Sequence, residues 1–239
     1  MKRLKSLLVL LFFCTLGLIS HAQESSLPEG FTTGNTVWIV RTGVSLNFVT
    51  GDGVDDMKTD WAAQKSYGEF KNTYGGNAFV GFYSPLGSSP VYFGLNAGVG
   101  MRSYKTSVKW KENISNLTTQ ETQLTAFNVQ ISPLNVGYIV KLNKSIALDF
   151  HVGLFFTCDF TGSFKTEEDY SDNTSKRNTI DIDDTDNYNK YDTGVLGGIG
   201  LWYNHWNVDI IYQRGLSSIY SGGKDIYSNK IILSLGYAF

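Results

Sequence analysis

Cysteine, proline and charge are all scarce in this chain of 239 residues. It holds 2 Cys and 4 Pro, and 18% of its residues are charged. The 20 Lys+Arg and 22 Asp+Glu give a formal net charge of −2, which argues against a dedicated nucleic-acid binder, because such a protein shows a basic face or tail. Beyond the N-terminal segment no stretch approaches the roughly 18 consecutive apolar residues of a spanning helix, which excludes a helical membrane protein.

Aromatic residues and glycine, in contrast, are plentiful. The chain contains 14 Tyr, 15 Phe, 5 Trp and 25 Gly. Sparse charge combined with many aromatic residues argues against disorder and favours β-structure with a large apolar surface. The length is that of one ordinary domain, which is long enough to bury a core.

The first 22 residues read as a secretory signal peptide. Met1–Lys5 is basic, Leu7–Ile19 is apolar, and Ser20–Ala22 places small residues before a cleavage site. The apolar run is too short for a membrane anchor, which needs about 20 residues. Removal of the signal takes Cys14 with it and leaves Cys158 as a single thiol, so we expect no internal disulfide.

Alternation of apolar and polar residues predicts eight strands. In Val91–Tyr104 the odd positions up to Met101 are all apolar, whereas the even positions are mostly Gly, Asn, Arg and Tyr. Ile146–Thr161 repeats this pattern with the even positions apolar. An apolar face of about 11 residues is what a tilted, membrane-crossing strand requires. The expected strands are residues 36–50, 76–84, 91–104, 123–140, 146–161, 193–203, 206–213 and 231–239.

The connections between these strands also alternate, between tight and long. Residues 85–90, 142–145 and 204–205 form tight turns, whereas the long connections are residues 51–71, 106–122, 162–192 and 215–228. Short turns on one rim and long loops on the other are typical of an outer-membrane barrel whose termini are periplasmic. We therefore predict an all-β fold, an eight-stranded antiparallel transmembrane β-barrel with short periplasmic turns and long extracellular loops. The expected organisation is a signal peptide (1–22), a periplasmic N-terminal segment (23–35) and the barrel (36–239).

A soluble eight-stranded barrel that carries its apolar face inside is the alternative. Such a barrel has a polar, charged exterior. The second face here is mostly Gly, Ser, Asn and Ala, which is too poor in Lys and Glu for an ordinary soluble surface. Small residues suit the crowded interior of an eight-stranded barrel. The pattern therefore favours apolar side chains on the outside.

Aromatic residues are expected to gather at the periplasmic rim, where their amphipathic rings suit the lipid headgroup region. For any one of them, simple lipid-facing bulk is the alternative. The predicted girdle consists of Trp38, Tyr83, Phe93, Tyr138, Tyr203, Trp206, Tyr237 and Phe239.

Several segments resemble a known family, the outer-membrane β-barrel domain proteins of Bacteroidota, which are often described as porin-family or PorT-like. The resemblance spans essentially the whole mature chain, and its specificity comes from the order and spacing of the motifs. The segments are Arg41–Asn47 (RTGVSLN), Ile131–Tyr138 (ISPLNVGY), Asp192–Gly200 (DTGVLGGIG), Tyr212–Ile219 (YQRGLSSI) and Leu233–Phe239 (LSLGYAF).

This resemblance implies an eight-stranded barrel in the outer membrane of a Gram-negative bacterium, and no defined activity. Phe239, with Tyr237 two residues before it, looks like the signal that the barrel-assembly machinery reads. Some relatives assist the type IX secretion apparatus, although none of the motifs singles out that branch.

Six polar side chains are expected in the lumen, where burial makes an isolated charge costly. They are Arg41, Arg102, Asp149, His151, Asp209 and Lys230. Three of them, Arg41, Asp149 and Asp209, lie at similar heights and could meet across a narrow barrel. They could form an ion-paired plug or line a pathway for a small solute, although eight strands seldom leave an open channel.

An enzyme would need a nucleophile or a base. His151 shares a face with Asp149, which suggests an oriented base, but no serine elbow or second carboxylate stands beside it. We therefore expect no enzymatic activity.

The loop of residues 162–191 is rich in acidic side chains and reads as a solvated surface loop. Its segment Asp181–Asp186 offers oxygen ligands at Asp181, Asp183, Asp184 and Asp186, but it lacks the glycine and the closing Glu of a calcium-binding EF-hand loop. Bridging of divalent ions to anionic surface glycolipid is the alternative. We expect no cofactor and no bound metal.

The sequence therefore predicts an outer-membrane protein with a structural, adhesive or surface-interaction role that it performs through its long extracellular loops. The expected partners are the lipid bilayer, the assembly machinery and a surface partner whose identity the sequence does not reveal. A narrow solute channel and an accessory barrel of a secretion system are the alternatives.

Overall fold

The computed structural model describes residues 35–239, except residues 88, 115 and 222–224. The expected signal peptide (1–22) lies outside the described residues, as does the expected periplasmic segment up to residue 34. None of the helices in the described part of the chain has the length and apolar character of a membrane-crossing helix. The elements are β1 (Val37–Thr50), α3 (Asp52–Ala63), β2 (Ser66–Lys71), β3 (Thr73–Pro85), β4 (Val91–Ile114), β5 (Leu117–Lys141), β6 (Ile146–Tyr170), β7 (Ser175–Asp181), the 3-10 helix η1 (Ile182–Asp184), β8 (Tyr191–Tyr203), β9 (Trp206–Ser218) and β10 (Tyr227–Ala238).

The strands pair antiparallel and close into a ring. The pairings run from β1 through β3, β4, β5, β6, β8, β9 and β10, and back to β1. At the closing seam Arg41 faces Gly236. Ring closure leaves these strands without a free edge, which is the condition for a sheet in lipid.

The described residues form ten strands, whereas the sequence predicted eight. The two additional strands, β2 and β7, lie in stretches that were expected to be long loops, and they pair with β4 and β6 outside the ring. Neither strand sequence, SYGEFK or SKRNTID, has a continuous apolar face, so the alternation pattern gave no signal for these two strands.

Side chains alternate between the two faces of the ring. In β6 the outward positions Phe150, Val152 and Phe156 are exposed, whereas the inward positions Ala147 and Asp149 are buried. The outward face of the ring is thus apolar and the interior holds most of the polar residues, which confirms the outward placement of the apolar face.

Three strands continue far beyond the ring at the end where the long connections lie. β4, β5 and β6 have 24, 25 and 25 residues, compared with 12 in β10 and 13 in β9. A membrane-crossing strand needs only about 9 to 11 residues. Residues 106–122 and 162–181 are therefore mostly strand, not loop.

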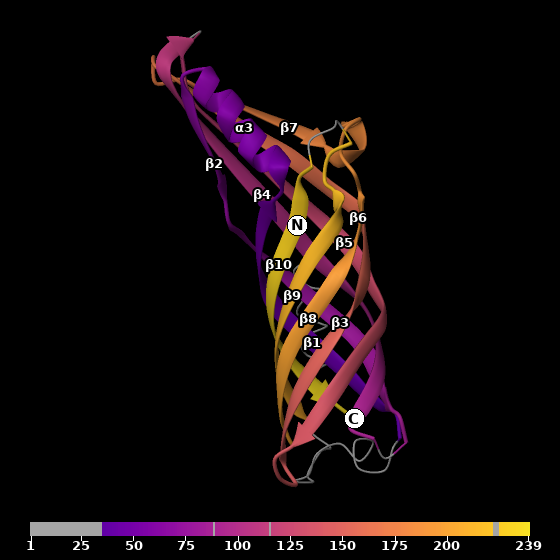
Figure 1. Cartoon of the computed structure of the whole chain (residues 1–239). Coiled ribbons are helices and arrows are strands. Elements are labelled where there is room, and N and C mark those ends of the chain that lie inside the picture. The colour runs from indigo at the N-terminus through magenta and orange to yellow at the C-terminus, as the bar shows by residue number, and fades with distance from the viewer. Residues whose placement is uncertain (1–34, 88, 115, 222–224) are drawn as a thin grey trace.

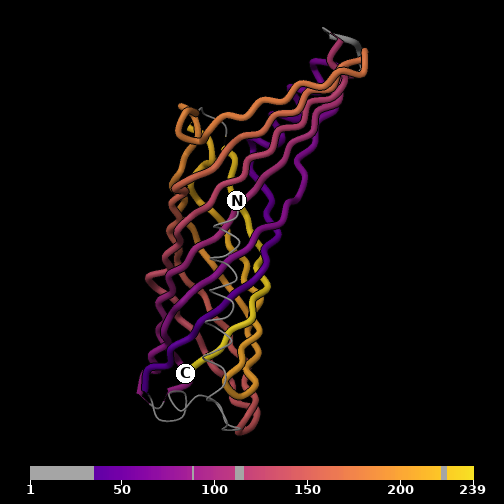
Figure 2. The backbone as a smooth tube through the Cα atoms, turned by 180° about the vertical axis from the view of Figure 1, so that it is seen from behind, coloured from indigo at the N-terminus to yellow at the C-terminus, as the bar shows by residue number. Residues whose placement is uncertain are grey.

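The outer parts of these strands form what we call the extension, together with the two additional strands. It consists of β2, residues 105–110 of β4, 117–123 of β5, 163–169 of β6, and β7, in that spatial order. The extension leans away from the axis of the ring in both views (Figures 1 and 2).

Helix α3 packs against the inner face of the extension, the face that continues the lumen side. The ring centroids of Trp61 and Phe70 are 5.6 Å apart. Trp61 also lies directly on Gly68, where an added Cβ would be 1.8 Å from the indole. Glycine is thus required at this position for the helix to approach the strand.

Three apolar layers cross the interior of the molecule. Their order follows from β6, along which Ala147, Phe155 and Phe164 belong to or pack against successive layers. The short-turn layer consists of Val37, Ile39, Tyr83, Tyr92, Ile139, Ala147, Trp202 and Ala238. The middle layer is Phe155, Leu196, Ile211 and Ile232, and the cap layer is Val54, Tyr104, Leu124, Ala126, Ile182, Tyr188, Ile219 and Ile226.

Candidate functional site

A first polar cluster lies between the short-turn layer and the middle layer. Arg41 of β1 and Asp209 of β9 form an ion pair of 2.7 Å between Nη1 and Oδ2, and their side chains are 4% and 0% exposed. The Arg41 guanidinium also lies over the Tyr83 ring, 5.2 Å from its centroid, and donates a hydrogen bond to Asn96. Two inward side chains from strands that are far apart in the sequence thus neutralise each other's charge inside the ring.

His151 of β6 lies between two carboxylates in the same cluster. Its Nδ1 is 3.6 Å from Asp149 and its Nε2 is 3.7 Å from Asp209, and the Tyr92 hydroxyl donates to Asp149 at 2.8 Å. The structure therefore brings together Arg41, Asp149, His151 and Asp209 from the set expected in the lumen.

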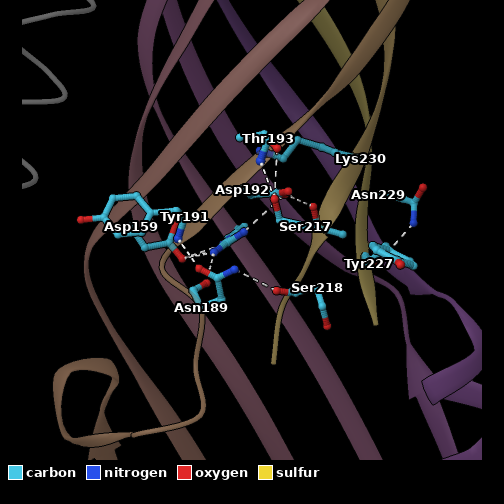
Figure 3. A network of polar contacts seen from close by, with 12 residues as sticks. Asp159, Asn189, Tyr191, Asp192, Thr193, Ser217, Ser218, Tyr227, Asn229 and Lys230 are labelled. Carbon is cyan, nitrogen blue, oxygen red and sulfur yellow. Dashed lines mark hydrogen bonds and ion pairs between the residues drawn. The ribbon is translucent and has the colours of Figure 1, made fainter. Parts of the chain in front are cut away.

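A second polar cluster lies between the middle layer and the cap layer. Arg102 of β4 donates from Nε to Asp159 of β6 at 2.7 Å, and its Nη1 is 3.7 Å from Asp192 of β8. The Tyr188 hydroxyl accepts from Arg102 at 2.9 Å and in turn donates to Asp159. Figure 3 shows Asp159 and Asp192 within this network.

Lys230 belongs to the second cluster and not to the first. Its Nζ lies 3.5 Å from the amide oxygen of Asn77, and the adjacent inward residue of β10, Ser228, donates to Asp192. Arg102 and Lys230 are thus separated from Arg41, Asp149 and Asp209 by the middle layer. The predicted set of six forms two clusters at different heights.

The sequence reasoning missed the acidic partners of Arg102. Asp159 lies two positions beyond Thr157 on the inward face of β6, and Asp192 precedes Gly194 on the inward face of β8. Asp159 lies within the expected strand 146–161 and could have been found from its alternation, whereas Asp192 lies one residue before the expected start of its strand at residue 193. Tyr188 lies in a connection and carries no such signal.

Side chains of the described residues pack the interior of the ring beside the first cluster. A cavity of about 20 Å³ beside Arg41, His151 and Gln130 is the size of one water molecule. The apolar layers and the two charge clusters follow one another along the axis, so the lumen offers no wide aqueous path.

Several of the aromatic side chains expected in the girdle are exposed to the outside of the ring. Trp38, Phe93, Tyr138, Tyr203 and Phe239 are exposed on the outer face. Trp206 and Tyr237 are half-buried and pack edge to face, with ring centroids 5.1 Å apart.

Tyr83 was wrongly assigned to this girdle. It is 2% exposed, points into the lumen, and packs against Tyr92 with the two rings tilted and their centroids 4.6 Å apart. β3 carries aromatic residues at both parities, since Phe79 and Tyr83 face inward whereas Phe82 contacts Trp38, so alternation alone did not fix its phase.

The acidic segment Asp181–Asp186 contains the end of β7 and η1. Asp183 forms an ion pair with Lys190, and the described residues contain no group of three or more His, Cys, Asp or Glu side chains arranged to hold a metal ion.

The extension provides a second candidate site. Its two outermost strands, β2 and β7, each pair on one side only, so the sheet presents two edges. On its inner face a groove of about 430 Å³ lies between Met57 and Trp61 of α3 and the strand residues Phe70 and Val108. An adjoining polar hollow of about 400 Å³ is lined by Gln120, Thr166, Glu168, Lys176 and Asn178.

Comparisons with known proteins give one family and several similar folds. The model of the outer membrane protein beta-barrel domain family matches residues 22–221. No curated protein sequence matches the chain. Similar solved structures include Ail, the attachment invasion locus protein of Yersinia pestis, with 14% identity over 86% of this chain and 99% of that chain and a TM-score of 0.36.

Two further structures have comparable values. Neisserial surface protein A is 10% identical over 84% of this chain and 97% of its own, with a TM-score of 0.37. The outer membrane protein OprG of Pseudomonas aeruginosa is 13% identical over 86% of this chain and 97% of its own, with a TM-score of 0.35.

Proposed function

Because this chain belongs to the outer membrane protein beta-barrel domain family, we propose that it is an eight-stranded transmembrane barrel whose extension binds partners at the cell surface. The protein lies in the outer membrane. The eight strands of the ring cross the lipid, and β2 and β7 belong to the extracellular part.

The extension is the observation that supports this proposal. β7 is exposed along its whole length and pairs only with β6, so its second edge offers unpaired backbone groups. An exposed edge outside the membrane can accept an extended segment of another chain as an additional strand. The groove beside α3 adds an apolar surface on the inner face of the same sheet.

In the proposed orientation the short-turn end is periplasmic and the extension is extracellular. The C-terminal Phe239 is exposed at the short-turn end, where its backbone exchanges hydrogen bonds with Trp38. This position suits a signal for the barrel-assembly machinery. Membership in the Bacteroidota, PorT-like branch is part of the proposal and rests on the sequence motifs.

Binding is favoured over conduction because of the filled lumen. The ion pair of Arg41 with Asp209 and the apolar layers lie across the path that a solute would take. Catalysis is disfavoured for a related reason. The carboxylates on either side of His151 lie inside the ring, and its described contacts include no hydroxyl or thiol nucleophile.

Shortening the β4–β5 hairpin tests the proposal. Thr106 and Thr122 face each other in the ladder, so an Asn-Gly turn can replace residues 107–121. We expect the variant to remain a heat-modifiable, β-rich barrel. In proteoliposomes, the native chain should bind to at least one of immobilised fibronectin, laminin, collagen or heparin, and the shortened variant should lose that binding.

A variant with an Asn-Gly turn in place of residues 142–145 is the matched control, because it alters the opposite end. Its binding should equal that of the native chain. Equal binding by the shortened variant, or no binding by the native chain, would contradict a surface role of the extension. An ion current through the native barrel that changes on replacement of Asp209 would favour the channel instead.

A further inference from the structure

Three lysines form a row across the outer face of the extension. Cross-strand neighbours share a face of a sheet, and the register runs from Lys71 of β2 to Lys105 of β4, Gln123 of β5, Lys165 of β6 and Thr179 of β7. Lys71, Lys105 and Lys165 thus project from one side of the sheet at one height. We propose that this lysine row binds the phosphate groups of anionic glycolipid in the outer leaflet of the membrane.

The height of the row fits the lipid headgroup region. On β4 and β5 the uppermost outward apolar residues, Met101 and Phe127, face each other, and Lys105 and Gln123 lie four positions farther along. Four residues of a tilted strand correspond to roughly 10 Å above the apolar band. The headgroup layer adds about 5 to 8 Å to each side of the hydrocarbon core. Lysine side chains can reach back towards that layer.

The direction of the row fits the same partner. The extension leans away from the axis of the ring (Figures 1 and 2). Its inner face carries α3 and the groove, as Trp61 and Val108 show. The outer face, with the lysines, continues the outward side of the ring, on which Met101 and Phe127 lie. Thr125 and Ser163, one step closer to the membrane, add hydroxyl groups that can donate to phosphate oxygens.

The acidic neighbours of the row leave lysine charge available. Glu121 and Glu69 lie two residues farther from the membrane than the lysine row. Glu121 pairs with both Lys105, at 2.6 Å, and Lys71, at 3.0 Å, and Glu69 pairs with Lys71 at 3.5 Å. Glu167, the cross-strand neighbour of Glu121, is paired with Arg177. Lys165 is exposed and belongs to none of the ion pairs among the described residues.

The row itself carries only positive charge, and Lys165 is its exposed member outside the ion pairs. One acidic residue, Asp181, lies on the membrane side of the row, where it is the cross-strand neighbour of Ser163. The proposal rests on the orientation given above but not on any protein partner of the extension. Its ligand is a phosphorylated lipid, and a lipid with the same acyl chains but no phosphate should not replace it.

Native mass spectrometry of the folded chain tests the proposal. The protein, released from neutral detergent micelles, is titrated with bisphosphorylated lipid A and with chemically dephosphorylated lipid A. We expect the native chain to retain the phosphorylated lipid at least tenfold more tightly, because each lysine near a lipid surface contributes to the attraction of an anionic group. The difference should shrink in high salt.

Substitution of the row provides the second measurement. The triple variant K71Q/K105Q/K165Q should lose the preference for the phosphorylated lipid. Its control is K58Q/K144Q/K176Q, which removes the same charge from α3, from a turn at the short-turn end and from the inner face of β7. Heat modifiability shows whether each variant has folded.

Equal retention of the two lipids by the native chain would overturn the proposal without any variant. Equal loss in both triple variants would show a general charge effect and would also overturn it. Displacement of the lipid by millimolar inorganic phosphate alone would mean that the row is a site for free phosphate. Since none of these results involves the β4–β5 hairpin binding assay, failure here is distinguishable from failure of the surface role.

Discussion

Among individual residues, Arg41 and Asp209 form a buried ion pair whose disruption should lower the free energy of unfolding. Removing one partner of such a pair leaves a charge without compensation, which costs about 3 to 5 kcal/mol. We expect Asp209→Asn to lower the free energy of unfolding in lipid vesicles by an amount of this order. The exposed pair of Lys58 and Asp55 is the control, because loss of a surface pair typically costs about 0 to 1 kcal/mol.

The double variant R41M/D209L distinguishes two explanations of that cost. If the penalty comes from an unpaired charge, an apolar pair should be more stable than Asp209→Asn alone. Urea unfolding of the two variants in the same vesicles measures the difference. A double variant as unstable as the single one would assign the loss to packing.

Glu121 forms the ion pairs that hold two lysines of the row, Lys71 and Lys105, within the protein. The hydrogen bonds from Lys105 and then from Lys71 lower the pKa of Glu121 to about 2. A lowered pKa means that this contribution to stability is present above the usual value near 4.5 and is lost as the pH falls from there to about 2. At neutral pH the carboxylate therefore competes with a lipid phosphate.

Glu121→Gln should consequently strengthen the retention of bisphosphorylated lipid A at pH 7, by several-fold. Glu168→Gln is the matched control, because Glu168 lies on the inner face of the same sheet, opposite Gln120. Native mass spectrometry reports both affinities. Weaker retention in the Glu121 variant would mean that the carboxylate positions the lysines and does not compete with the lipid.

Among the elements, α3 depends on a single glycine for its position. A side chain at Gly68 would collide with the Trp61 ring, and overpacking of this kind typically costs about 1 to 3 kcal/mol. We expect Gly68→Ala to expose residues 52–65 to limited proteolysis while heat modifiability is retained. Gly76→Ala should have no such effect, since nothing lies within 4 Å of its added Cβ.

The strands of the ring were predictable because lipid imposes a strict condition on them. Every outward position from Phe150 to Phe156 must be apolar, and alternation records this directly. The same condition disappears beyond the membrane, where β7 has the sequence SKRNTID and is exposed along its whole length. Sequence patterning therefore identified the ring and missed the extension.

The candidate site was predictable to the same limited degree. Arg41 and Asp209 lie well inside regular strands, so their inward direction and similar height followed from counting residues. Asp159 was missed although it lies within the expected strand 146–161, because the inward face was followed only to Thr157. Asp192 was missed because its strand was expected to begin at residue 193, whereas β8 begins at Tyr191. The lysine row needs the register between three separate strand pairs, which a single sequence does not contain.

At the scale of the whole molecule, the barrel is closed at several heights and not at one. Tyr92 and Trp202 belong to the short-turn layer, and the Arg41 cluster and the middle layer lie beyond them. We expect the native chain to be silent in planar bilayers. Tyr92→Ala with Trp202→Ala should also be silent, because the next levels remain.

Asp209→Ala combined with Leu196→Ala tests the other levels in the same way. Conductance in the Tyr92 and Trp202 variant would show that the short-turn layer alone holds the barrel closed. Conductance in the Asp209 and Leu196 variant would show that the Arg41 cluster and the middle layer together do so. The folded fraction of each preparation, read from its heated and unheated gel mobility, serves as the control.

The unbroken course of β4, β5 and β6 from the short-turn end into the extension also has a mechanical consequence. A load applied at the tip runs lengthwise along strands that are bonded to each other over most of their length. Such a load shears many hydrogen bonds at once, whereas a pull on a flexible loop would open them one after another. The extension should therefore resist bending under load and transmit the force to the ring, which the surrounding membrane holds in place.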